Sequence, residues 1–214
     1  MDTTITDHLL STTRAVRRKL DLTRSVEPEV LTKCLELAIQ APSPSNSQQW
    51  RWLVVRDQEI KNQLGRLFRD VGTAYLRRSA ERLGAAATEG PAARMLASAK
   101  YLVDVFEQVP VLVIPCLQGR PQGGNAGFSG FYGGIFPAVW NLQLALRSRG
   151  LGSTLTTFHL QHEQEAAGIL GIPYDVSQVG LLPVAYTTVP DFKPARRAPI
   201  EQISYLDTWG SPLS

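Results

Sequence analysis

The chain has 214 residues, of which 43% are hydrophobic and 19% are charged, values that are ordinary for a globular protein and unlike those of a disordered chain. The length suits one compact domain over residues 1–214, and the sequence contains no internal repeat and no linker. The formal net charge of +3 comes without a basic stripe interleaved with aromatic residues, so we expect no nucleic-acid partner.

The two cysteines and the N-terminal residues indicate which kinds of site and which cellular location to expect. Cys34 and Cys116 lie in apolar patterns without Cys-x-x-Cys spacing, which predicts small buried side chains rather than a disulfide framework or a zinc site. Residues 1–5 lack the basic start and the apolar core of a signal peptide. No apolar run approaches membrane-spanning length, so we expect a cytoplasmic protein with no membrane partner.

The first third of the chain predicts three helices and one strand. Apolar residues recur at helical spacing from Val30 to Ile39. Pro28 suits the first turn of that helix, where its missing N–H has no intrahelical partner. The expected elements are a helix over Thr4–Thr12, a helix from Pro28 that ends before Pro42, a strand over Arg51–Val55 and a helix near Gln58–Arg69.

The segment Ala41–Trp50, with the sequence APSPSNSQQW, is polar and rich in proline and serine although it connects two apolar elements. A helix-to-strand connection needs only a few turn residues. This connection instead presents a row of small hydroxyl and amide groups, which can hydrogen-bond a flat polar ligand and let it approach the backbone. The alternative is a loop that only caps the preceding helix.

The middle of the chain contains a segment that is hard to place and a strong strand pattern. Residues 71–90 are rich in alanine and arginine, and they either extend the preceding helix or form a mobile insertion. A helix over Ala92–Glu107 is expected next. The run Val109–Ile114 has the sequence VPVLVI. A continuous apolar run of this kind is typical of a strand buried on both faces.

Seven glycines lie between Gly119 and Gly134, together with Phe128, Phe131 and Tyr132. We predict a mobile loop, because glycine leaves the backbone with many accessible conformations. The segment has neither the Gly-Lys-Ser/Thr ending of a P-loop nor the acidic residue of a dinucleotide-binding fingerprint. Its aromatic side chains would gate a ligand pocket, and the alternative is a glycine-rich surface loop.

The last third of the chain alternates between helices and strands before an irregular tail. The expected elements are a helix over Phe136–Arg149, a strand over Leu151–Phe158, a helix over Gln161–Leu170 and a strand over Val179–Tyr186. Residues 188–214 show little regular pattern, yet they carry Tyr205 and Trp209. A tail that is free in solvent would not need these large aromatic side chains, so we infer that the tail packs on another surface.

Two arginine clusters stand near the ends of the chain: Arg14 with Arg17 and Arg18, and Arg196 with Arg197. The planar guanidinium fork of arginine binds two oxygens at once, which suits a phosphate group. The alternative for each cluster is a solvated surface. The histidines show no spacing typical of a metal site, and His159 or His162 would either reach a substrate or lie in a surface turn.

In chain order, the segments RAVRR, APSPSNSQQW, FPAVWNLQLALRSRGLGSTLTT, GLLPVAY, ARRAPIE and YLDTWG resemble the nitroreductase family of FMN-dependent oxidoreductases. The resemblance covers Arg14 to Gly210. The chain departs from the family pattern at Pro44-Ser45, where Gly-Gly or Ser-Gly is usual, and at Gln49, where proline is usual. A serine often stands where this chain has Ala15, so the backbone N–H of Ala15 would replace that hydroxyl contact.

The resemblance implies an α+β, three-layer fold with a central, mostly antiparallel sheet flanked by helices. It also implies an intertwined homodimer with FMN at the interface and the tail 188–214 packed on the partner subunit. For the FMN phosphate it implies Arg14, Arg17 and Arg197, with Arg18 and Arg196 as alternates and the backbone N–H of Ala15 beside them. For the rest of FMN it implies the segment Pro42, Ser43, Pro44, Ser45 and Asn46 along the ribityl chain and ring edge, and Leu155, Thr156 and Thr157 against the ring.

The same resemblance implies the reaction. NAD(P)H would reduce FMN, and an electron-poor aromatic or quinone would then accept the electrons in a ping-pong cycle. Because the flavin carries the chemistry, no catalytic side chain is expected, and Phe128, Phe131 and Tyr132 would line the substrate pocket. The alternatives are a biosynthetic dehydrogenase, a dehalogenase or a flavin-destroying enzyme on the same scaffold, and a protein that only stores or senses FMN.

Overall fold

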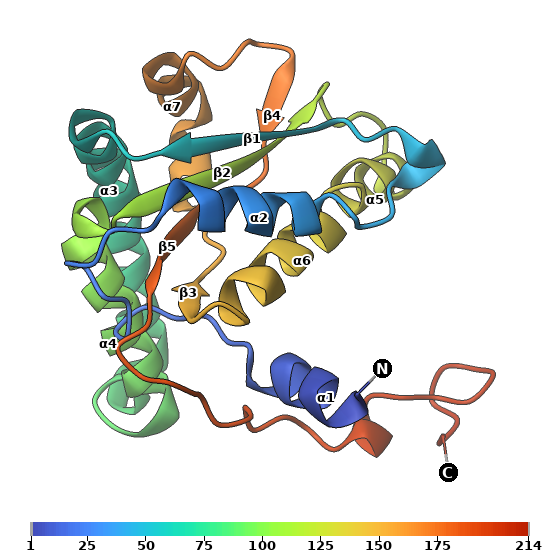
Figure 1. Cartoon of the computed structure of the whole chain (residues 1–214). Helices are drawn as coiled ribbons and strands as arrows, with labels where there is room; N and C mark the ends of the chain where they lie inside the picture. The colour runs from blue at the N-terminus through green and yellow to red at the C-terminus, as the bar shows by residue number, and fades with distance from the viewer. Residues whose placement is uncertain (1, 214) are drawn as a thin grey trace.

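The computed structural model describes residues 2–213 and has a central sheet covered by helices on both faces (Figure 1). The strands are β1 (Trp50–Val55), β2 (Val111–Gln118), β3 (Leu151–Ser153), β4 (Val176–Gln178) and β5 (Leu182–Tyr186). The sheet order is β1-β2-β5-β3, β4 also pairs with β2, and all these pairs are antiparallel. The predicted α+β architecture with a mostly antiparallel sheet is confirmed.

Strand β2 is buried on both faces, as its apolar sequence predicts. Because successive side chains of a strand point to opposite faces, Val111 and Val113 join one core cluster while Leu112 and Ile114 join the other. The register is fixed by pairs such as Val54 with Val113. Both cysteines are free and buried, which confirms the prediction from their apolar surroundings.

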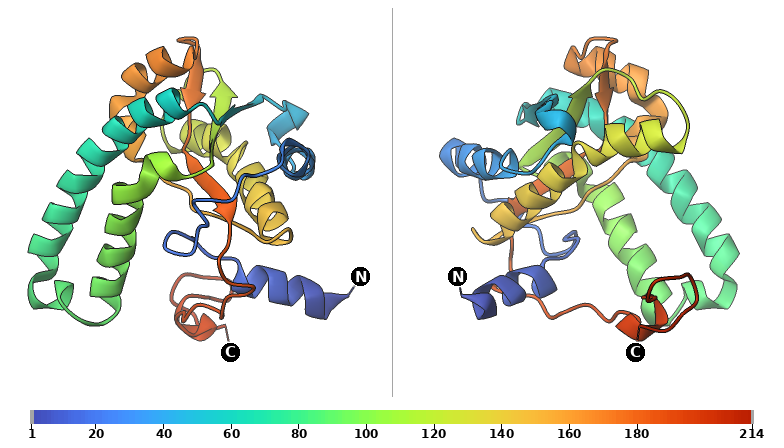
Figure 2. Two further views of the ribbon diagram at one scale, coloured as in Figure 1. Left: turned by 60° about the vertical axis from the view of Figure 1, so that its left-hand side comes forward. Right: turned by 90° about the vertical axis from the view of Figure 1, so that its right-hand side faces the viewer.

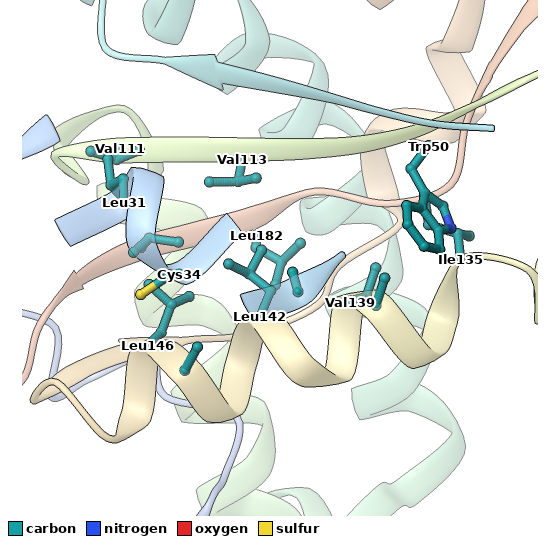
Figure 3. Close-up of a cluster of buried hydrophobic side chains, with 14 of the residues drawn as sticks. Leu31, Cys34, Trp50, Val111, Val113, Ile135, Val139, Leu142, Leu146 and Leu182 are labelled. Carbon is teal, nitrogen blue, oxygen red and sulfur yellow. The ribbon is translucent and has the colours of Figure 1, made fainter. Parts of the chain in front are cut away.

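Helices α2 (Pro28–Ala38) and α6 (Phe136–Arg147) cover one face of the sheet. Figure 3 shows Val139, Leu142 and Leu146 along one side of α6, directed at the sheet strands. Cys34 of α2 enters the same cluster. At the edge of this layer, the indole N–H of Trp50 donates to the carbonyl of Gly134 at 2.5 Å, which ties β1 to the start of α6.

Helices α3 (Gln58–Leu83), α4 (Gly90–Val105) and α7 (Glu163–Leu170) cover the opposite face. Phe68 of α3 stacks on Phe106 with ring centroids 4.0 Å apart. Helix α3 continues well past the predicted end at Arg69, and a short 3-10 turn over Gly84–Ala87 leads into α4. The ambiguous residues 71–90 are therefore mostly helical, and α3 and α4 form a long hairpin that extends beyond the sheet (Figure 2).

Three predicted elements need correction. Residues 125–133 form helix α5 (Asn125–Gly133), so the irregular loop expected over 119–134 is wrong for that part. The strand expected over Leu151–Phe158 ends at Ser153, because the chain then leaves the sheet and keeps only an isolated bridge between Thr156 and Leu181. The helix expected over Gln161–Leu170 begins at Glu163, after a 3-10 turn over Phe158–His162.

Helix α1 and the C-terminal tail lie on the same side of the molecule, below the sheet in Figures 1 and 2. Helix α1 (Thr3–Thr12) confirms the predicted N-terminal helix, and the side chain of Asp2 caps it by accepting from the Thr4 N–H at 2.9 Å. The tail beyond β5 is irregular except for a 3-10 turn over Ile200–Gln202. Among residues 2–213, no helix combines the length and apolar content that crossing a bilayer requires.

Candidate functional site

The first arginine cluster runs along the edge of the sheet beside β3. Ala15 forms a parallel bridge with Ser153, and the Val16 N–H donates to the Ser153 carbonyl at 2.9 Å. The side chain of Val16 is buried in the protein, whereas Ala15 and Arg17 on either side of it are less buried. The side chain of Arg17 is half-buried, whereas Arg14 and Arg18 are exposed.

Arg17 and the segment 155–157 line one cavity of about 320 Å³, which we call the hairpin cavity. Its lining residues are Arg17, Leu155, Thr156, Thr157 and Phe158 together with Phe68, Tyr75, Met95, Ala99 and Leu102 of the α3–α4 hairpin. The structure therefore brings together four residues that the sequence places at a flavin. The sequence missed the hairpin residues, because only the packing of α3 against α4 directs them to this cavity.

Arg17 and Thr156 are polar residues among those that line the hairpin cavity. Burial lowers the pKa of Arg17 below its usual value, and the nearby Tyr75 partly offsets this effect. The side-chain Oγ1 atom of Thr156 is buried without a hydrogen-bond partner in residues 2–213. The backbone N–H of Thr156 donates to the Leu181 carbonyl at 2.9 Å. A buried hydroxyl of this kind is costly unless a ligand or water satisfies it, so the cavity suits a group with a polar edge.

The serine- and proline-rich segment has an unusual backbone. Ser45, Asn46 and Gln48 all have left-handed conformations, with φ values of 50°, 51° and 48°. Such conformations are uncommon outside glycine and concentrate at functional sites. The Ser43 hydroxyl accepts from the Gln48 N–H at 3.2 Å, and the Ser47 N–H donates to the Pro44 carbonyl at 3.0 Å. The turn is thus held internally, while its side chains are largely exposed.

This segment lies away from the α3–α4 hairpin, whose residues line the hairpin cavity (Figures 1 and 2). Pro44 and Phe131 line a separate hollow of about 350 Å³ between the segment, β2 and α5. Tyr132 packs edge-on against Phe131 with centroids 5.3 Å apart, and Phe128 is exposed. The residues predicted to bind FMN therefore line two separate hollows of the chain, and the aromatic residues of α5 lie beside the second hollow.

The backbone of the tail contacts the first arginine cluster at Lys193. Arg14 Nη1 donates to the carbonyl of Lys193 at 2.9 Å, three residues before Arg196. Both Arg196 and Arg197 are exposed, and Arg197 Nη1 reaches the Arg196 carbonyl at 3.3 Å. The structure thus connects the two clusters through the backbone of the tail.

A charged cluster holds the start of the tail against α1 and the end of α6. Asp191 pairs with Arg147 of α6 and with His8 of α1, the latter at 3.1 Å. The Phe192 N–H donates to the same carboxylate, and this hydrogen bond, with smaller effects of His8 and Arg147, lowers the pKa of Asp191. Sequence reasoning missed this cluster, because its members lie far apart in the chain.

The histidines do not form a metal centre: within residues 2–213, no group of three or more histidine, cysteine or acidic side chains is arranged to hold an ion. His162 pairs with Asp70 at 2.9 Å. His159 is fully buried, which corrects the expectation of a surface turn, and it is not among the residues that line the hairpin cavity. Burial lowers its pKa to about 4.

Comparison with known proteins agrees with the fold. The sequence profile of the nitroreductase family matches residues 10–186. Iodotyrosine deiodinase 1 of Homo sapiens is 27% identical over 203 residues, covering 91% of this chain, and the chain spans 66% of the length of that relative.

Solved structures share the architecture. Oxidised iodotyrosine deiodinase bound to FMN and 3-iodo-L-tyrosine has a TM-score of 0.65 and 23% identity, covering 87% of this chain and 92% of the other. A nitroreductase with bound FMN from Desulfitobacterium hafniense DCB-2 has a TM-score of 0.65 and 18% identity, covering 97% of this chain and 100% of the other. At these identities the likeness concerns the fold.

Proposed function

The chain belongs to the nitroreductase family, and on that premise we propose that it binds FMN and passes electrons from NAD(P)H to an electron-poor aromatic or quinone acceptor. The observation that carries the proposal is the hairpin cavity, where Arg17 meets Leu155–Thr157 around an unpartnered Thr156 hydroxyl. FMN would supply the redox chemistry, so the protein needs to bind, orient and shield it rather than contribute a nucleophile or an acid.

The residues of the site divide by chemistry. Arg14, Arg196 and Arg197 supply charge for a phosphate, with Ala15 and Arg18 beside them. Arg17 and Thr156 supply donors in a partly dry cavity, where a charge-assisted bond is stronger than in water. Residues 42–46 supply a preformed turn with exposed polar groups. A cation close to the ring would favour the reduced, anionic form of the flavin.

We further propose a homodimer in which the partner supplies the second half of each site. In one protomer, the Pro42–Asn46 turn lies away from the α3–α4 hairpin, whose residues line a cavity with Arg17, so a single chain does not enclose a flavin with both (Figures 1 and 2). Apolar surface is available for association: Phe136 and Trp140 are exposed on the outer side of α6, and Trp209 of the tail is 91% exposed. Exposed apolar patches of this kind mark interaction surfaces.

The first experiment is a visible absorption spectrum of the natively purified protein, repeated on the supernatant after heat release. We expect flavin bands and released FMN. Arg17→Ala should weaken FMN binding by about tenfold or more, because it removes a charge-assisted donor. Arg82→Ala, an exposed position near the end of α3, is the matched control and should bind normally. A colourless protein that takes up no added FMN would refute the proposal.

Shared sites can be tested by complementation. Arg17→Ala and Asn46→Ala alter opposite halves of the predicted site. If each site draws these residues from different subunits, a mixed dimer of the two variants contains one intact site, and co-expression restores about half of the FMN content per mixed dimer. If one chain supplies both residues, every site in the mixed dimer stays damaged and nothing is restored.

Turnover distinguishes an oxidoreductase from an FMN-storage protein. We expect steady NAD(P)H oxidation when a quinone is present, with parallel double-reciprocal lines because both substrates use one stacking position. A protein that retains FMN but does not cycle would be a carrier or sensor. The second enzymatic candidate is reductive dehalogenation, which the 27% identity to human iodotyrosine deiodinase 1 favours.

A further inference from the structure

The α3–α4 hairpin supplies one wall of the hairpin cavity. Tyr75 comes from α3, and Met95, Ala99 and Leu102 come from α4. Gly72 lets the two helices approach closely, since a Cβ added there would lie 2.6 Å from Cγ2 of Val103. The wall is therefore a packed part of the fold and faces the segment that we assign to the flavin.

This wall is apolar and aromatic. The ring of Phe158 lies 5.2 Å from that of Tyr75 and 5.1 Å from that of Phe68, both tilted by about 45°. Met95 stands at the opening, with 42% of its surface exposed. Aromatic rings at such spacing, with a flexible thioether beside them, favour a flat ring as ligand.

The cavity also lacks an anionic group. Arg17 is the one charged residue among those of the described chain that line it. Acidic side chains on or beside the hairpin already have cationic partners: Glu107 pairs with Arg69 at 3.0 Å, and Asp104 pairs with Lys100 at 2.6 Å. An ammonium group held here would lose water without gaining a carboxylate, which is unfavourable for a charged group.

We propose that the α3–α4 wall makes the flavin site selective for planar acceptors without an ammonium group and against zwitterionic amino acids, with Tyr75 and Met95 as the specificity-determining residues. The inference rests on the proposed function, because it assigns an acceptor class to the same flavin site. It separates this chain from a deiodinase of free iodotyrosine, the ligand present in one of the similar structures.

A matched pair of ligands isolates the amino-acid group. 4-Methyl-2-nitrophenol and 3-nitro-L-tyrosine share the nitrophenol ring and differ in the zwitterion. Dissociation constants come from the perturbation of the flavin spectrum in the FMN-loaded protein, and kcat/KM comes from NAD(P)H oxidation. We expect the nitrophenol to bind at least about tenfold more tightly, since an unpaired ammonium group is costly to desolvate. The same order should hold for 2-iodophenol against 3-iodo-L-tyrosine.

Two substitutions test the named residues. Met95→Glu places a carboxylate on the wall and should reduce the preference by at least about fivefold through a new ion pair with the ammonium group. Ala97→Glu adds the same charge at an exposed position of α4 that does not line the cavity, and it should leave the preference unchanged. Tyr75→Ala should weaken nitrophenol binding by about tenfold, whereas Tyr75→Phe, which keeps the ring, should bind as the wild type does.

The outcomes separate this inference from the proposal on which it rests. FMN content is measured first, and a protein that binds no FMN overturns both. If FMN binds and turns over while the two nitro ligands bind equally, the proposed function stands and the selectivity is wrong. Equal effects of Met95→Glu and Ala97→Glu would show that net charge rather than the wall sets the preference, which also overturns the inference.

Discussion

At the scale of single residues, His159 and Arg17 are two ionisable groups whose pKa is lowered by burial. His159 was expected either to reach a substrate or to lie in a surface turn, yet it is completely buried and both ring nitrogens lack partners in residues 2–213. Arg17 is half-buried in a cavity, whereas Arg18 beside it is exposed. The family resemblance implies Arg17 as a phosphate ligand and Arg18 as its alternate.

We predict that acidification destabilises the fold through His159. Its pKa is about 4 in the folded state against 6.5 for an unperturbed histidine, so the unfolded chain binds the proton first. The free energy of unfolding therefore falls as pH drops from about 6.5 to about 4, by about 3 kcal/mol for this group. Urea denaturation across this range should show the loss in the wild type, and His159→Leu should remove that part of it. Equal pH dependence in both proteins would contradict the assignment.

We also predict that the Asp191 cluster anchors the tail. Asp191→Asn removes the partner charge of Arg147 and His8, so the residues after β5 should open more often. Trypsin cleavage after Arg196 and Arg197, which are exposed in the same tail, should accelerate by about fivefold under native conditions. Glu201→Gln, an exposed acidic residue further along the tail, is the control and should leave the cleavage rate unchanged. Unchanged cleavage in Asp191→Asn would show that other contacts hold the tail.

At the scale of elements, the hairpin depends on close packing at one glycine. An added methyl at Gly72 meets Val103 Cγ2 at 2.6 Å and Phe158 Cδ2 at 3.3 Å. We expect Gly72→Ala to lower the free energy of unfolding by about 1–2 kcal/mol, because overpacking outweighs the gain in helix propensity. Gly168→Ala in α7 meets nothing within 4 Å and should raise it by about 0.5–1 kcal/mol. Thermal and urea denaturation of both variants would check the opposite signs, and a stabilised Gly72→Ala would contradict the packing argument.

The elements that were predicted well carry a strong periodic signal. The helices at 3–12 and 28–38 and strand β1 follow the expected ranges closely, because capping residues and apolar spacing act locally. Strand β2 was predicted over Val109–Ile114 but runs from Val111 to Gln118, because its pairing with β1 and β4 extends it past the apolar run. Helix α5 was missed, since its glycines favour a loop when considered alone. Strand β4 was missed because three residues give too short a pattern, and its pairing with β2 is a tertiary contact.

At the scale of the whole molecule, the tail is the part least explained by one chain. Ile203, Leu206 and Trp209 are exposed, although an isolated protomer gains nothing by presenting them to water. The proposed homodimer accounts for this exposure, because the surface of the partner subunit would cover these apolar side chains.

We predict that removing residues 200–214 weakens the dimer. The dissociation constant, measured by sedimentation velocity, should rise by roughly tenfold or more, because apolar surface that the partner buries is lost. Ile5→Ser, on the exposed side of α1, provides a single-residue comparison with a smaller expected effect. A wild-type protein that is monomeric at micromolar concentration would contradict the homodimer itself, and an unchanged constant after truncation would remove the tail from the interface.

The sequence by itself determined the family, the alternation of most helices and strands, and the burial of both cysteines. The helices, the strands and the buried cysteines follow from apolar periodicity, which acts locally, whereas the family follows from the resemblance of contiguous motifs to those of known proteins. Only the tertiary structure decided that Arg17 meets Leu155–Thr157 while Pro42–Asn46 lies elsewhere, and that Tyr75 and Met95 form the opposite wall. These contacts depend on how α3, α4 and the sheet pack together. Because the residues involved lie far apart in the chain, no periodic pattern within a single segment predicts them.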